Sequence, residues 1–246
     1  MPIGEPVVFV HGWGAMPGTY SPALRAIRQS RRLYAPILPG HGGRRAIRIS
    51  GEGVFPALAD DVVSRVPADM RPAAWVGHSL GGGVAIHAAL RYPELVSRLI
   101  LVCPVGGDGD MSLPGFVRLV RGSAREARGN DRSAAKESAA TMRRLLRHPI
   151  YSGRVGLAAK YANFERLLAL LSARGIPIRI YTAEEDHVTV PLAHIPGVRE
   201  ERGPGRHSWP VEEPGRFARW LESRLAEKES LYRHPVELFT VREAFA

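Results

Sequence analysis

One short stretch constrains the fold of this chain more than any other part. The apolar run Ala73–Val76 leads into Gly77-His78-Ser79-Leu80-Gly81, and a small-residue helical pattern follows. This order predicts a strand, one tight turn and a helix, with Ser79 at the apex of the turn. A strained serine there crowds the residues two positions away, which explains a glycine on each side. Such a turn lifts the hydroxyl clear of the sheet, so Ser79 is a candidate nucleophile.

Apolar runs and helical patterns alternate along most of the chain. The expected strands are Pro6–Val10, Leu33–Leu38, Ala73–Val76, Leu99–Val102, Pro177–Tyr181 and, more weakly, Val198–Glu201. The expected helices are Ser21–Arg31, Val54–Val66, Leu80–Tyr92 and Pro214–Lys228. Strands that alternate with helices predict an α/β fold with a mainly parallel, doubly wound sheet of about six strands.

The interval 107–171 breaks this alternation, because it is helix-prone throughout. We expect an inserted helical lid here, over the carboxyl ends of the strands where α/β proteins bind ligands. The expected domains are a core made of residues 1–106 and 172–228, the lid 107–171, and a C-terminal tail 229–246. The tail could be a strand, a docking arm or disorder.

Composition narrows the class of protein. A hydrophobic fraction of 45% fits a soluble globular chain, and no apolar run approaches the roughly 20 residues of a membrane span. Only Cys103 is present and the N-terminus has no signal-peptide pattern, so we expect a cytoplasmic location. The formal charge of +10 indicates either an anionic partner or a solvated arginine-rich surface. No nucleic-acid-binding signature accompanies it, and no such partner is expected.

Two further motifs complete a resemblance to a known family. His11-Gly12-Trp13-Gly14 follows the first strand, and a Thr182–Pro191 segment that contains Asp186 follows a late one. With the serine turn, these motifs resemble the α/β-hydrolases over everything except the tail. The resemblance implies an oxyanion hole formed by the amides of Trp13 and Leu80, with Asp186 as the triad acid. Family members usually begin with an antiparallel hairpin, which we expect to be largely missing because the His-Gly turn starts at residue 11.

The other members of the site are less tightly constrained. Glu184, Glu185, Asp108 and Asp110 remain alternatives to Asp186 as the acid. His207 follows the last strand and is the expected base, which gives the chain order Ser79, Asp186, His207. We expect the side chains of Trp13, His78 and Trp209 to contact the substrate. No metal-ligand spacing, phosphate loop or dinucleotide motif occurs, so no metal or cofactor is expected.

The resemblance implies hydrolysis of a small carboxylic ester through an acyl-enzyme. The His-Gly-Trp-Gly and Gly-x-Ser-Leu-Gly-Gly motifs are also similar to the pimeloyl-carrier-protein methyl ester esterases, which recognise an acidic carrier protein through lid arginines. Basic residues recur at helical spacing within the expected lid, at Arg118, Arg121, Arg125, Arg128 and Arg132. The alternatives are a solvated charged face, a haloperoxidase-like or carbon–carbon hydrolase, and a ligand receptor that turns over little substrate.

Overall fold

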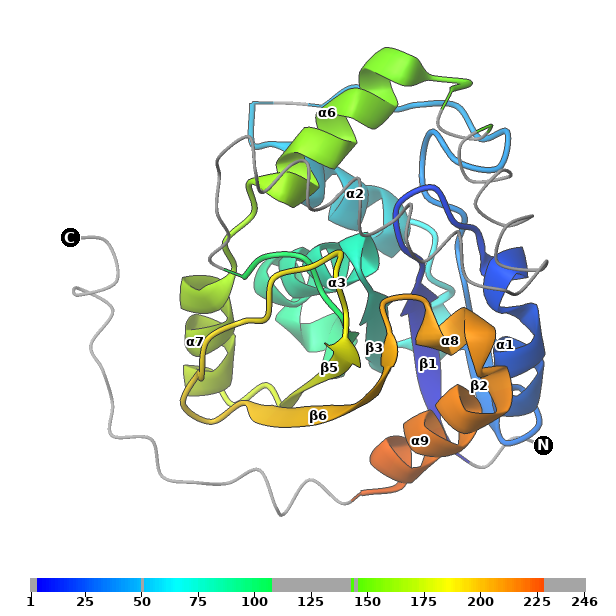
Figure 1. Ribbon diagram of the computed structural model, residues 1–246, viewed down its shortest axis with the longest axis vertical. Helices are drawn as coiled ribbons and strands as arrows, with labels where there is room; N and C mark the ends of the chain where they lie inside the picture. The colour runs from blue at the N-terminus through cyan, green and yellow to red at the C-terminus, as the bar shows by residue number, and fades with distance from the viewer. Residues whose placement is uncertain (1–3, 50, 108–142, 144–145, 228–246) are drawn as a thin grey trace.

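The chain builds a parallel sheet in a computed structural model (Figure 1). The structure describes residues 4–49, 51–107, 143 and 146–227. The six strands of the sheet run in the order β2-β1-β3-β4-β5-β6, and every pairing is parallel. The strands are β1 (Gly4–Val10), β2 (Arg31–Tyr34), β3 (Ala73–His78), β4 (Val96–Val102), β5 (Ile178–Glu185) and β6 (Arg199–Arg206). The predicted fold class and number of strands are therefore confirmed.

Helices cover both faces of the sheet. One face carries α1 (Ser21–Ile27), α8 (Trp209–Glu212) and α9 (Pro214–Ala226). The other carries α2 (Val54–Val63), α3 (Leu80–Arg91) and α7 (Glu165–Ala173), while α6 (Pro149–Lys160) packs against α2 above them (Figure 1). Short 3-10 helices lie at η1 (Pro17–Tyr20), η2 (Ala68–Met70) and η3 (Pro93–Leu95). Among the described residues, no helix is both long and apolar enough to cross a bilayer.

Alternate residues of the central strands supply two separate apolar layers. In β1, Val8 and Val10 point into the layer under α2 and α3, whereas Val7 and Phe9 point into the layer under α1 and α9. Side chains of a strand alternate between faces, and helices bury both faces of this sheet. This double burial explains why the strands read as continuous apolar runs in the sequence.

All six strands differ from their predicted bounds, and for β2 and β6 the physical reason is identifiable. Strand β2 ends at Tyr34 rather than Leu38, because Pro36 has no amide to donate to a ladder. Strand β6 continues to Arg206 although its sequence is largely charged. It is an edge strand, and Glu201 on it accepts hydrogen bonds from Trp220 and Arg224 of α9. A charged strand is stable there because its polar side chains reach helix partners and solvent.

The described part of the expected lid contains α6 and α7. Helix α7 packs against α3, and its Leu168 and Leu171 are fully buried in the core. The predicted boundary between residues 171 and 172 therefore falls inside a helix that belongs to the core. The arginine run from Arg118 to Arg132, the alternative acids Asp108 and Asp110, and the tail 229–246 lie outside the described residues.

Candidate active site

The turn between β3 and α3 places Ser79 in a conformation that side chains rarely adopt. Ser79 has φ 54° and ψ −119°, and it lies directly before the first residue of α3. A Cβ at Gly77 would come within 2.4 Å of the Gly81 carbonyl oxygen, and one at Gly81 within 2.1 Å of the Val10 carbonyl oxygen. Both positions therefore require glycine, which accounts for the spacing of the motif.

The loop after β1, which we call the oxyanion loop because it carries the predicted oxyanion residue Trp13, lies against this serine. A Cβ at Gly12 would be 3.3 Å from the Ser79 Cβ, so the backbone of the loop nearly touches the turn. The amide of Gly14 donates to His41 Nε2 at 3.0 Å, and the amide of Gly12 donates to the Tyr20 hydroxyl at 3.3 Å. Leu80 is the first residue of α3, and amides in the first turn of a helix have no intrahelical acceptor. The two predicted oxyanion amides, of Trp13 and Leu80, thus belong to adjoining segments.

Asp186 and His207 form a hydrogen-bonded pair at the ends of β5 and β6. His207 Nδ1 lies 2.9 Å from Asp186 Oδ2, and the Asp186 side chain is only 2% exposed. The carboxylate also accepts hydrogen bonds from the amides of Val188 and Thr189 and from the Thr189 hydroxyl. Asp186 is therefore held ionised and oriented by four donors.

The charges of this pair shift both pKa values. Burial alone would raise the pKa of Asp186, but the adjacent His207 and the hydrogen bonds hold it well below its usual value. Burial alone would lower the pKa of His207, but the Asp186 carboxylate raises it well above the usual value. The pair therefore favours an ionised acid beside an imidazole that readily takes up a proton.

The backbone of His207 joins this pair to the serine turn. His78, the residue before Ser79, has its Nε2 2.9 Å from the His207 carbonyl oxygen, and the two imidazole rings are 4.9 Å apart. The turn, the oxyanion loop and the Asp186–His207 pair are thus gathered at the carboxyl edge of the sheet. This edge is where open α/β sheets bind their ligands.

A chain of hydrogen bonds through Tyr20 and His78 links the three loops of the site. The His207 carbonyl can only accept, so His78 Nε2 carries the proton and its Nδ1, 2.8 Å from the Tyr20 hydroxyl, accepts from it. The hydroxyl oxygen in turn accepts from the Gly12 amide. Burial lowers the pKa of His78 to about 3, which keeps this residue neutral in the required tautomer at neutral pH. The hydrogen-bond chain fixes the loop after β1 and the segment that carries His207 relative to Ser79.

Removing the Tyr20 hydroxyl tests this positioning role. Tyr20→Phe leaves the Gly12 amide and His78 Nδ1 without a partner, so the oxyanion loop should shift against the serine. We expect kcat to fall about tenfold with KM nearly unchanged, because small misplacements of catalytic groups cost rate more than binding. Steady-state kinetics, normalised to titrated active sites, measure the effect.

The matched control is Tyr92→Phe, at the end of α3, which removes a hydroxyl that is hydrogen-bonded to Asp60. This variant should keep wild-type kcat. Equal kcat in both variants would show that the link is merely structural.

Two of the three residues expected to contact the substrate are buried. Trp209 is fully buried among Tyr181, Phe217 and Trp220, so its side chain offers no surface for the expected substrate contact. His78 is likewise buried and spans Tyr20 and His207, which makes it a scaffold residue. Trp13 is 37% exposed, and its ring lies against Gly156 of α6. Only Trp13 keeps a surface that a substrate could reach.

The alternative acids next to Asp186 are displaced from the site. Glu184 and Glu185 are exposed at the end of β5, whereas Asp186 is turned inward toward His207. A residue that the sequence did not single out lies there instead. Cys103 follows β4 with φ 44°, and its thiol lies with the polar atoms of Asp186 and His207 in a group less than 4.8 Å across. Burial raises the pKa of this thiol, so Cys103 stays neutral beside the pair.

The sequence of this chain matches a known protein family. Residues 7–220 match the model of a family described as the alpha/beta hydrolase family. The chain belongs to this family. This alpha/beta hydrolase is 34% identical over 98 residues to a pimeloyl-acyl-carrier-protein methyl ester esterase of Xylella fastidiosa, a match that spans 40% of this chain and 36% of that protein. It is 33% identical over 115 residues to the corresponding esterase of Nitrosomonas europaea, spanning 47% of this chain and 40% of that protein. The chain thus covers well under half the length of these curated relatives.

A solved structure shares the fold of this hydrolase over nearly its full length. The structure is that of Est816, described as an N-acyl homoserine lactone degrading enzyme. It superposes with a TM-score of 0.73 at 22% identity, covering 89% of this chain and 93% of that one. At this identity the likeness establishes the architecture alone.

Proposed function

We propose that this alpha/beta hydrolase cleaves a carboxylic ester through Ser79, His207 and Asp186. The observation that carries the proposal is the buried Asp186–His207 hydrogen bond beside a serine in a strained strand-to-helix turn. His207 takes the Ser79 proton as the serine oxygen attacks the ester carbonyl. Asp186 holds the imidazole in position and stabilises its cation. The Trp13 and Leu80 amides donate to the tetrahedral oxyanion.

The second half of the reaction follows from the same groups. His207 returns its proton to the departing alcohol, which leaves an acyl group on Ser79. Water then attacks the acyl-enzyme with His207 again acting as the base, and the acid product leaves. An ester with a short acyl group and a good leaving group, such as nitrophenyl acetate, should show a burst of product.

The pH dependence of kcat/KM tests the role of His207. The base must be neutral to accept the serine proton, so activity is lost as pH falls through the pKa of His207 in the free enzyme. Because the Asp186 charge raises that pKa well above its usual value, the half-maximal pH should lie above 6.5, the ordinary pKa of histidine. A profile measured with nitrophenyl acetate from pH 5 to 10 provides the check. A half-maximal pH well below 6.5 would contradict the assignment of His207.

A second candidate substrate is a methyl ester held on an acidic carrier protein. The curated relatives that carry this activity support it, together with the basic character of the chain. The proposed recognition residues include Arg121 and Arg125. An encounter steered by charge slows as salt screens the field, whereas the reaction of a neutral ester does not.

Salt dependence separates this candidate from a general esterase. We expect kcat/KM for the carrier-bound methyl ester to fall steeply between low and moderate ionic strength, with little change for nitrophenyl acetate. Arg121→Glu with Arg125→Glu should lower kcat/KM for the carrier-bound ester alone. Equal salt responses for the two esters would leave general ester hydrolysis as the function.

A further inference from the structure

Helix α6 has apolar side chains on two opposite faces. Its inner face packs on the protein through Val155 and through Tyr151, which lies against Gly40. Its outer side carries Ile150 and Leu157, which are exposed. Together with Leu146 in the turn before the helix and Tyr161 directly after it, they form what we call the α6 ridge: Leu146, Ile150, Leu157 and Tyr161. Ile150, Leu157 and Tyr161 follow at spacings of seven and four, so they lie within about 40° of one another around the helix axis.

This exposure is concentrated in one place. Leu146, Ile150, Leu157 and Tyr161 are 65%, 82%, 50% and 45% exposed. The other exposed large apolar side chain among the described residues is Trp13, which itself contacts α6 at Gly156. A helix that needed only to cover the core would have a polar outer face. A gathered apolar surface therefore indicates a binding partner.

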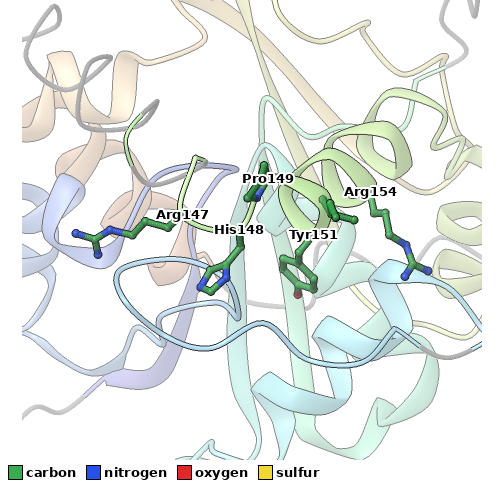
Figure 2. Close-up of a pocket in the computed structure, with 6 residues that line it drawn as sticks. Arg147, His148, Pro149, Tyr151 and Arg154 are labelled. Atoms are coloured by element: carbon green, nitrogen blue, oxygen red, sulfur yellow. The ribbon is translucent and has the colours of Figure 1, made fainter.

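The charged side chains within the stretch that carries the ridge are all of one sign. The described stretch 146–164 contains no aspartate or glutamate, and the cations Arg147, Arg154 and Lys160 accompany the ridge. A pocket of about 370 Å³ opens at the start of α6, lined by Arg147, His148, Pro149, Ile150, Tyr151 and Arg154. Figure 2 shows Arg147 and Arg154 reaching to opposite sides of this pocket. The partner should therefore combine apolar groups with negative charge.

We propose that α6 docks this protein on an anionic lipid surface. The side chains of the ridge project outward, and Ile150 projects furthest into solvent. Such a convex surface can insert into an apolar layer, whereas a partner helix would bind in a groove. Acyl chains would take up Ile150 and Leu157, while the arginines stay at the level of the phosphate groups. Negative lipid headgroups attract such a basic segment.

Docking in this way would bring the active site close to the lipid. Trp13 connects α6 to the oxyanion loop, and that loop touches the Ser79 turn. An ester dissolved in the membrane surface would then reach the serine by a short path. The docking itself does not depend on the proposed function, and a binding measurement tests it separately from activity.

Vesicle flotation with the full chain tests the proposal. Wild type should float with vesicles of phosphatidylcholine and phosphatidylglycerol at low salt, and hardly at all with phosphatidylcholine alone. Ile150→Glu with Leu157→Glu should weaken the partition at least tenfold. The control, Arg25→Glu with Arg219→Glu at exposed positions on α1 and α9, changes the net charge twice as much as the ridge variant does. It should bind to within about threefold of wild type.

Two further measurements make the outcome decisive. The ridge variant should keep wild-type Tm and wild-type activity on soluble nitrophenyl acetate, because its changes lie on exposed positions. Because Cys103 is buried, a polarity-sensitive dye attached to the Ile150→Cys variant reports on position 150. The dye fluorescence should shift to the blue only with anionic vesicles. The proposal is overturned if wild type does not float, if the ridge variant floats equally well, or if an acidic protein binds the ridge while anionic vesicles do not.

Discussion

Replacing Ser79 by alanine should lower kcat for nitrophenyl acetate by at least about a thousandfold. The remaining rate would come from substrate binding and the oxyanion amides, since no other nucleophile stands at this turn. Ser79 contributes its hydroxyl, whereas the turn itself is set by Gly77, Gly81 and the backbone. The variant should therefore fold normally.

A thermal melt and a second serine variant control this result. Ser79→Ala should keep a Tm within a few degrees of wild type. Ser64→Ala, at an exposed position after α2, should keep full activity. Substantial esterase activity in a folded Ser79→Ala protein would remove Ser79 from the mechanism.

Asp186→Asn should produce the second-largest loss, of about a thousandfold in kcat. An asparagine amide cannot stabilise the histidine cation, and it can hold the imidazole in the wrong tautomer. The same change removes the charge that raises the pKa of His207, so the half-maximal pH of kcat/KM should move downward. Both effects appear in one set of pH–rate profiles.

The neighbouring acids provide matched controls for this change. Glu184→Gln and Glu185→Gln alter exposed carboxylates that lie two positions and one position before Asp186, and both variants should keep nearly full activity. Asp108→Asn and Asp110→Asn should also leave kcat nearly intact. A large loss in Asp108→Asn or Asp110→Asn with an active Asp186→Asn would move the acid to the segment after β4.

The sequence predicted those parts of the site that depend on local constraints. The strained turn needs glycine at positions 77 and 81, so the spacing of the glycines predicts the backbone conformation of the turn. The central strands are buried on both faces and read as apolar runs, and these runs predict the parallel sheet. The positions of Asp186 and His207 after late strands followed from the resemblance, and the structure brings their side chains within 2.9 Å.

Other parts depend on contacts between distant segments, which no local pattern reveals. Tyr20 meets His78 across 58 positions, and His78 meets His207 across 129. An aromatic layer under the sheet buries Trp209, a residue we expected to contact the substrate. Cys103 approaches His207 only because β4, β5 and β6 end side by side. The apolar spacing of residues 165–171 does not reveal which surface they cover, so the predicted lid includes most of α7.

Labelling with a fluorophosphonate tests the central claim most directly. An activated serine attacks the phosphorus and keeps a covalent adduct, and peptide mass spectrometry identifies the residue that carries it. We expect one adduct per chain, on the peptide that contains Ser79, with the rate of labelling strongly reduced in Asp186→Asn. A protein that remains unlabelled, or one that carries the adduct on another residue, would contradict the assignment of Ser79 as the nucleophile.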